Sequence, residues 1–578
     1  MKKRLSALCL VLAMLTALCA GCGGQAASDE TSASAPAMST EAPAAPELSS
    51  SAAPGPEPED SETVVPSTPE EPGIPQVEYP LTEEPVTLSM WYSFPGDLAD
   101  MMQEYLGNGK SSVLQAVEEK TGVGLRFMLQ SVTTANDNFN LLVASGDYPD
   151  LFQNAGSYYS GGMDKAVDEE VLVDLTERLE TCAPNYNALI HQDAATLADA
   201  STSSGRVVEI NRIMEDYTRS STGLVIRQDW LDDLGMEQPV TLDDLHDVLA
   251  TFKEEKGAVE PLGLGYTGVL DQNEICSAFD VYGVYAAFMG TYPFYVTDGQ
   301  VKFGWIEDGF LDYLTMMNQW YSEGLIGADY YIQNTGHGID SSKTTTGQCG
   351  VWMHDYFQME LVQSQMNEEN ANVQAIAAPV KAEGQTLHFA GKKTLVGGQT
   401  LAITTGCADP ELALKYIDYF FTEEGSLLCN YGIEGEGLEY DDDGNPQYTE
   451  LVYKNPDHSM RETQVMYTLT IGPFLEKESR NDIAYSEKEN AARSIWDSNT
   501  DDACTMPTTD LNAEQAAEMS GIMGDLLTYA TGKITEFIIG ADSLEHWDTY
   551  IAEMEQFHVG RAIEIYQEVY DAYMEIQG

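Results

Sequence analysis

Aromatic and acidic side chains lie together where the N-terminal part of the sequence predicts the ends of β-strands. Trp91 and Tyr92 close one β-rich run, and the loop 145–150, which contains Asp147 and Asp150, directly precedes another. Aromatic rings cover the flat C–H faces of sugars, and carboxylates accept strong hydrogen bonds from hydroxyl groups. These residue types therefore suit the binding of a neutral polyol.

The motifs of familiar cofactor, nucleotide and metal sites are incomplete in this sequence. Gly263–Gly268 fits G-x-G-x-x-G but does not open a βαβ unit, and Gly109–Ser111 lacks the upstream glycine of a P-loop, because that position is Glu104. Asp441–Asn445 lacks the downstream Glu of a calcium loop and predicts a turn. The eight His have no metal-ligand spacing. We therefore expect no catalytic residue, no metal and no cofactor, although sequence leaves a paired-carboxylate glycosidase open.

Strand-like and helix-like segments alternate from Val86 onward, which predicts an α/β fold with ligands beyond the carboxyl ends of the strands. Two helix starts are distinct. Thr241–Asp244 forms a capping-box pattern, and Asp409 followed by Pro410 combines an N-cap with a first-turn proline. The other expected elements are strands at 86–92, 122–130 and from 149, helices at 111–120 and 136–145, and a hairpin at 296–301.

The composition limits the class of function. The 578 residues include 94 Asp plus Glu against 28 Lys plus Arg, a formal net charge of −66, and 43% are hydrophobic. This apolar content permits a sizeable core. The charge argues against nucleic acid as a partner and against adsorption to an anionic membrane through a basic patch.

Residues 1–21 have the layout of an export signal, with Lys2, Lys3 and Arg4 before an apolar run. The run ends in Ala20, Gly21 and Cys22, which resembles a lipoprotein lipobox, although Cys19 stands where Leu is usual. This resemblance implies that Cys22 is lipidated. Residues 22–80 are rich in Pro, Ala, Ser and Glu, and 23–80 hold 11 Pro and no Lys or Arg, so we expect a disordered tether.

Six cysteines follow Cys22, and they are widely spaced without a disulfide pattern. We expect each of them to be a small buried apolar residue, and sequence cannot pair them. They are Cys182, Cys276, Cys349, Cys407, Cys429 and Cys504.

Five ordered segments resemble bacterial ABC-transporter extracellular solute-binding lipoproteins of family 1, the Gram-positive LipO-like type. They match the family's A-S-G-D-x-P-D, R-x-D-W-L-x-x-L-G and W-Y-x-E-G-L-I segments, its late helix followed by Y-G-I-E-G, and Phe537–Gly540 before Trp547 and Asp548. The matching residues are 139–150, 223–241, 320–326, 410–435 and 537–548.

The resemblance implies a two-lobed periplasmic-binding-protein-like (type II) fold with a hinge and a ligand cleft between the lobes. The solute-binding body would be 81–578, with the chain crossing the hinge near 206–224, 385–397 and 430–445. Lobe 1 would take about 86–205 and 395–435, and lobe 2 about 206–394 and 436–578.

The resemblance also implies a function. We expect a monomer, lipid-anchored on the extracellular face of the membrane, that delivers a carbohydrate, an oligosaccharide being favoured, to the transmembrane subunits of an ABC permease. A peptide or other solute, a non-transport surface sensor and a surface glycoside hydrolase remain alternatives. The candidate ligand-binding residues are Trp91, Tyr92, Asp147, Asp150 and Asn154 in lobe 1, and Tyr217, Trp230, Tyr266, Tyr282, Trp352 and Asp355 in lobe 2.

Overall fold

The structure, a computed structural model, describes residues 74–216, 220–264, 273–283, 292–332, 341–389, 394–469, 472–480, 485–507 and 511–577. All of them belong to one compact unit, Pro72–Gly578. The predicted export signal, Cys22 and the tether up to residue 73 lie outside the described residues, as do Tyr217 and Tyr266. Tyr79 packs on Tyr419 with ring centroids 5.3 Å apart, so the packed body includes residues assigned to the predicted tether.

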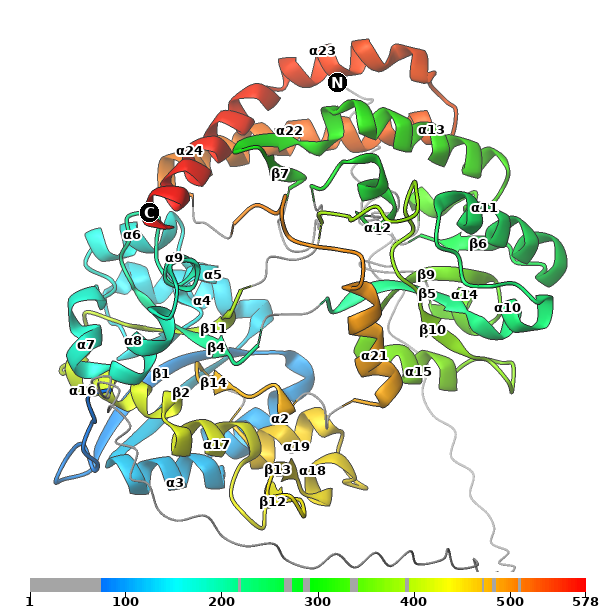
Figure 1. Cartoon of the computed structure of the whole chain (residues 1–578). Helices are drawn as coiled ribbons and strands as arrows, with labels where there is room; N and C mark the ends of the chain where they lie inside the picture. The colour runs from blue at the N-terminus through cyan, green and yellow to red at the C-terminus, as the bar shows by residue number, and fades with distance from the viewer. Residues whose placement is uncertain are drawn as a thin grey trace, which may run out of the picture. The chain divides into compact units, whose positions relative to one another are not determined.

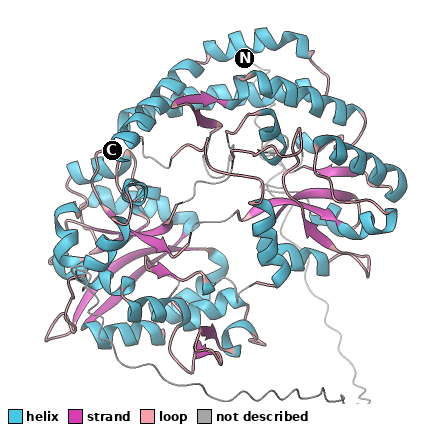
Figure 2. Cartoon of the chain, in the orientation of Figure 1, coloured by secondary structure: helices cyan, strands magenta, loops and turns pink. Residues whose placement is uncertain are grey.

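A six-stranded mixed sheet forms the core of the first lobe (Figures 1 and 2). Strand β1 runs parallel to its neighbours β2 and β3, whereas β11 is antiparallel to both of its neighbours, β3 and β4. The strand order is β14 (Leu475–Glu476), β4 (Glu209–Met214), β11 (Val396–Ile403), β3 (Leu151–Gln153), β1 (Val86–Phe94) and β2 (Val123–Ser131).

Helices pack on this sheet because their apolar faces complete its two cores. One core contains Val113 and Val117 of α3 with Ala413, Tyr416 and Ile417 of α16. The helices of the first lobe are α2 (Ala99–Met102), α3 (Ser112–Thr121), α4 (Val132–Ser145), α5 (Ala155–Tyr158), α6 (Gly162–Asp168), α7 (Leu179–Cys182), α8 (Pro184–Ile190), α9 (Ala194–Asp199), α16 (Pro410–Asp418), α17 (Glu423–Tyr431), α18 (Glu450–Tyr453) and α19 (Met460–Tyr467).

The second lobe contains a smaller sheet of four strands. Strand β5 is antiparallel to β9 and β10, and β6 runs parallel to β9. The order is β10 (Val373–Ala375), β5 (Thr222–Arg227), β9 (Cys349–Asp355) and β6 (Glu260–Gly263). Its helices before the C-terminal group are α10 (Gln228–Leu234), α11 (Leu242–Thr251), α12 (Asn273–Cys276), α13 (Asp308–Ser322), α14 (Ser341–Thr345), α15 (Met359–Ser364) and α21 (Glu487–Trp496).

Three C-terminal helices complete the core of the second lobe: α22 (Ala513–Ile538), α23 (Trp547–Gln556) and α24 (Val559–Gln577). Figure 1 shows α22 beside α13 and α24. Helix α24 also reaches α9, where the hydroxyl of Tyr573 donates to Asp199 Oδ1 at 2.9 Å. None of the helices in the described part of the chain is long and apolar enough to cross a membrane.

Two segments assigned to the second lobe from sequence lie in the first sheet. They are β4 and β14, which pair with each other and join the sheet through β11. Val465 and Phe474 are buried in the same core, so the first lobe continues to about residue 476. The third passage between the sheets therefore follows Glu476 and lies beyond the expected segment 430–445.

Local sequence signals set several element boundaries. Thr241 and Asp244 form the reciprocal capping box at α11, and Asp409 accepts from the backbone of Leu412 at the start of α16. The hairpin of β7 (Phe294–Thr297) and β8 (Gln300–Phe303) turns at Asp298 and Gly299, whose φ angles of 53° and 76° are those of a type I′ turn.

One predicted start is wrong. Helix α4 begins at Val132 and not at Asn136. Its first turn contains Thr133 and Thr134, and β-branched residues lower helix propensity, so the sequence pattern did not reveal that turn.

Candidate functional site

A cavity of about 250 Å³ lies at the carboxyl edge of the first sheet, where parallel α/β sheets place their ligands. Its lining residues come from the ends of β1 and β4, from the segment that leads into α2 and from α2 itself, from β11 and α19, and from the chain on either side of β14. We call it the arginine pocket. It is lined by Tyr92, Pro95, Leu98, Met102, Arg212, Gln399, Arg461, Gln464, Val465, Phe474 and Arg480.

The backbone is irregular where β11 meets this pocket. The pairing register with β4 shifts between Gly397 and Thr400, and Gln399 within that bulge has φ of 90°. A non-glycine residue at such a φ is strained, and β-bulges redirect side chains next to functional sites. The bulge places Gln399 in the pocket lining.

Charge in the arginine pocket is positive. Arg212 forms an ion pair with Glu476 at 2.9 Å, and the guanidinium of Arg480 lies 5.7 Å from the ring of Phe474. Burial lowers the pKa of Arg480, but the nearby Tyr448 and Glu476 outweigh this and raise the pKa above its usual value. Arg480 therefore stays charged although it is enclosed.

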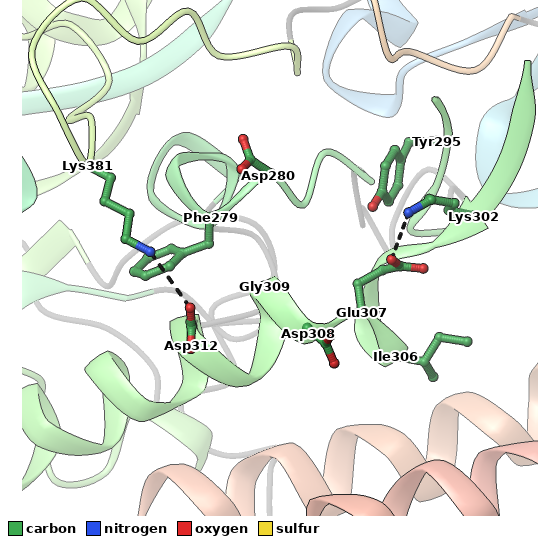
Figure 3. A pocket seen from close by; sticks show the side chains of 10 residues that line it. All are labelled: Phe279, Asp280, Tyr295, Lys302, Ile306, Glu307, Asp308, Gly309, Asp312 and Lys381. Carbon is green, nitrogen blue, oxygen red and sulfur yellow. Dashed lines mark hydrogen bonds and ion pairs between the residues drawn. The ribbon is translucent and has the colours of Figure 1, made fainter. Parts of the chain in front are cut away.

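A second cavity, of about 470 Å³, lies in the second lobe (Figure 3). We call it the acidic pocket. Two ion pairs cross its lining, Lys302 with Glu307 at 2.9 Å and Lys381 with Asp312 at 3.7 Å. The lining residues are Phe279, Asp280, Tyr295, Lys302, Ile306, Glu307, Asp308, Gly309, Asp312 and Lys381.

Aromatic rings support one side of the acidic pocket. Tyr282 packs edge-on against Tyr295, with centroids 5.7 Å apart, and against His388, at 5.3 Å. The hydroxyl of Tyr282 donates to Asp280 Oδ1 at 2.8 Å, which fixes that carboxylate. His388 Nδ1 lies 2.6 Å from Asp501 Oδ1. Burial raises the pKa of Tyr295, so its hydroxyl stays protonated at neutral pH.

The structure brings two of the sequence-predicted residues to these cavities. Tyr92 lines the arginine pocket, and Tyr282 holds Asp280 and Tyr295 of the acidic pocket. Asp147 is exposed in the loop after α4, and Asp355 ends β9, where its Oδ2 accepts from Gln358 at 3.3 Å.

Three predicted tryptophans lie in the core. Trp91 is 0% exposed, and its Nε1 donates to Asn138 Oδ1 at 2.8 Å. Trp352 is also 0% exposed, and Trp230 packs edge-on against Phe252 in the core of the second lobe. Burial of this extent gives these rings packing roles, because no ligand can reach them in this conformation.

Two predicted polar residues hold the backbone of the first lobe. Asp150 Oδ2 accepts from the amide and the hydroxyl of Ser89, at 2.7 and 2.6 Å. Asn154, at φ of 51°, accepts from the amide of Thr400 at 2.8 Å. These contacts connect β3 with β1 and β11. They engage the side chains of Asp150 and Asn154 in hydrogen bonds within the protein.

Sequence reasoning missed the arginines. Arg212, Arg461 and Arg480 lie far apart in the chain, and no motif contains them. The available signal in the sequence was that Arg is scarce in this chain. The structure then places three of these few Arg in the lining of one cavity. All six cysteines of the body are buried, as predicted, and they are unpaired, which sequence had left open. Asp441–Asn445 forms the turn between β12 (Leu438–Tyr440) and β13 (Pro446–Tyr448), also as predicted. Within the described ranges no group of three or more His, Cys, Asp or Glu is arranged to hold a metal ion.

Comparisons with known proteins agree with this architecture. The profile described as "Bacterial extracellular solute-binding protein" matches residues 107–426. Lipoprotein LipO of Bacillus subtilis (strain 168) is 27% identical over 365 residues, 60% of this chain and 67% of LipO. The fructooligosaccharide ABC transporter substrate-binding protein FusA of Streptococcus pneumoniae serotype 4 is 23% identical over 521 residues, 86% of this chain and 92% of FusA.

A solved structure resembles the chain over most of its length. It is an extracellular solute-binding protein from Bifidobacterium longum subsp. infantis, with a TM-score of 0.66 at 18% identity, covering 85% of this chain and 98% of that one. The structural likeness confirms the predicted two-lobed α/β fold.

Proposed function

Because the chain belongs to the family of bacterial extracellular solute-binding proteins, we propose that it captures an oligosaccharide and delivers it to the transmembrane subunits of an ABC permease. The observation that carries the proposal is the mixed aromatic and carboxylate lining of the acidic pocket. FusA, which matches most of the chain, is named for fructooligosaccharide transport, and this supports the same ligand class.

The chemistry of the acidic pocket suits hydroxyl-rich ligands. Asp280, Asp308 and Asp312 are exposed carboxylates that can accept hydroxyl hydrogens, while the half-buried Phe279 offers ring surface to C–H faces (Figure 3). Lys302 and Lys381 neutralise part of the charge and donate to sugar oxygens. A purely apolar ligand would leave these polar groups unpaired, which costs binding energy.

Capture follows from a difference in affinity between two conformations. An oligosaccharide that contacts the arginine pocket of the first lobe and the acidic pocket of the second would favour the closed arrangement of the lobes. It can shift that equilibrium only by as much as it binds one state more tightly than the other. The permease would then recognise the closed form.

We propose binding without turnover, because the relatives reported above are named as binding proteins or a lipoprotein and not as enzymes. The body would act as a monomer. A glycoside hydrolase remains the alternative to test, since several carboxylates line one cavity. Release of shorter saccharides from a bound oligosaccharide would support the hydrolase.

A lipid on Cys22 would hold the protein at the extracellular face of the membrane. The family match and the likeness to lipoprotein LipO support this location. The lipid of a lipobox cysteine carries two acyl chains, which bind a membrane far more firmly than one, whereas the acidic body contributes no electrostatic attraction to an anionic surface. Replacing Cys22→Ala should move the protein from the membrane fraction to the medium, and membrane retention of that variant would contradict the anchor.

A thermal-shift screen tests the ligand class. An oligosaccharide at about 100 times its Kd should stabilise the folded chain by about 2.7 kcal/mol and raise the Tm. Asp308→Asn should reduce the shift because it removes a lining carboxylate, whereas Asp442→Asn, an exposed acid in the β12–β13 turn, should not. A Tm that rises with peptides and with no saccharide would refute the proposal.

A further inference from the structure

The arginine pocket has the opposite charge to the rest of the molecule. The chain carries a formal net charge of −66 and contains eleven Arg, of which three line this one cavity. None of the lining residues that the structure describes is acidic. Glu476, outside the lining, pairs with Arg212 at 2.9 Å, but the described lining itself presents three guanidiniums and no carboxylate, a charge pattern suited to an anionic group.

The three guanidiniums come from separate elements that converge. Arg212 lies on β4, Arg461 is in the first turn of α19, and Arg480 follows β14. Helix α19 is fixed there by the capping box of Ser459 and Glu462. Convergence from three elements argues against a chance row of solvated side chains on one helix face.

Arg212 has an unsatisfied donor. Its side chain is 25% exposed, and its Nε is buried and forms no hydrogen bond among the described residues, while its other end pairs with Glu476 at 2.9 Å. A buried donor without an acceptor is costly, and a ligand oxygen would satisfy it. The strained backbone of Gln399 beside it adds an amide side chain that can donate or accept.

We propose that the arginine pocket binds the carboxylate of an acidic sugar unit, so that the ligand is an oligosaccharide containing a uronic or similar sugar acid. This inference rests on the proposed function and specifies its substrate class. Guanidinium groups match carboxylates in planar, paired hydrogen bonds, which a neutral hydroxyl cannot reproduce. A cavity of about 250 Å³ is below the usual range for a drug-sized ligand, so it takes one sugar unit of a longer chain.

The test compares two pairs of ligands, each with an acidic and a neutral member. Trigalacturonate and its fully methyl-esterified form share one skeleton, and 3′-sialyllactose and lactose form a second pair. Calorimetric titration of the mature chain should show at least one acidic member bound about tenfold or more tightly than its neutral partner, with the preference weakening as salt rises.

Two variants test whether the preference for the acidic ligand arises in the arginine pocket. Arg461→Gln removes an exposed guanidinium from the pocket, and Arg126→Gln removes an exposed guanidinium from β2 of the same lobe, outside it. Arg461→Gln should weaken the acidic ligand about tenfold and leave its neutral partner within about twofold, whereas Arg126→Gln should change neither. Unchanged thermal unfolding of both variants confirms that they fold.

Distinct outcomes separate this inference from the proposed function. Neutral members that bind as tightly as acidic ones, or equal effects of Arg461→Gln and Arg126→Gln, would overturn the acidic-sugar assignment and leave oligosaccharide capture intact. If no saccharide binds, in either pair or in a neutral oligosaccharide panel, both proposals fail.

Discussion

A buried carboxylate in the first lobe should make the stability of this protein depend on pH in an unusual direction. Asp418, in α16, is 0% exposed. Its Oδ1 accepts from the amide of Tyr186 at 2.9 Å, and its Oδ2 accepts from Asn185 Nδ2 at 2.7 Å. Burial raises its pKa to about 6, because these two hydrogen bonds only partly offset the loss of water around the charge.

The size and sign of the effect follow from that pKa. The ordinary pKa is 3.8, so the folded value is about two units higher. Ionisation of Asp418 therefore destabilises the folded chain relative to the unfolded chain by about 3 kcal/mol. The folded pKa is raised, so the contribution of Asp418 to stability is fully present below about pH 4. It is lost as pH rises through 6.

The assay is chemical denaturation of the unmodified chain and of Asp418→Asn at pH 4 and pH 7.5. Asn cannot ionise, so its free energy of unfolding relative to the unmodified chain should improve by about 3 kcal/mol between the two pH values. The same substitution at exposed Asp442 should show no such gain. A difference for Asp418→Asn that does not change with pH would refute the reasoning.

Two further predictions concern the second lobe. A Cβ at Gly223 would lie 2.4 Å from the ring of Trp496, so Gly223→Ala should cost about 1–3 kcal/mol, whereas Gly521→Ala, with open space around it, should be neutral or slightly stabilising. Arg227→Met removes a fully buried cation from Asp229 and should cost about 3–5 kcal/mol, against about 0–1 kcal/mol for the more exposed Arg206→Met. Urea unfolding measures the free energy of unfolding of all four variants. Equal losses for Gly223→Ala and Gly521→Ala would contradict the packing argument, and equal losses for Arg227→Met and Arg206→Met would contradict the burial argument.

Much of the fold was predictable because its signals are local. Strand β1 follows a β-rich run, Thr241 and Asp409 mark helix starts by capping, and Asp298–Gly299 marks a hairpin. The exchange of β4 and β14 into the first sheet was not predictable, because the pairing partners of a short strand depend on residues far away in sequence. The order of the family segments predicted two lobes, but it did not predict that β4 and β14 belong to the sheet of the first lobe.

The candidate site was less predictable than the fold. Tyr92 was a candidate because it ends a β-rich run, and Tyr282 because aromatic rings suit sugar faces; both lie at a cavity, yet Trp91, one position before Tyr92, is buried in the core. Alternation along a strand places neighbours on opposite faces, and both faces of this sheet are buried, Trp91 in one core and Tyr92 in the other. Sequence alone did not say which of the two would reach a cavity. Arg212, Arg461 and Arg480 meet only through tertiary structure, so their pocket had no sequence signature.

The central claim is that this chain binds an oligosaccharide between two lobes and does not transform it. Calorimetric titration of the mature body, without the lipid anchor, with oligosaccharides and with peptides tests that claim most directly. One saccharide bound per chain with a Kd in the micromolar range or below, recovered unchanged after the titration, is the predicted result. Binding of peptides alone, or a saccharide recovered as shorter products, would contradict it.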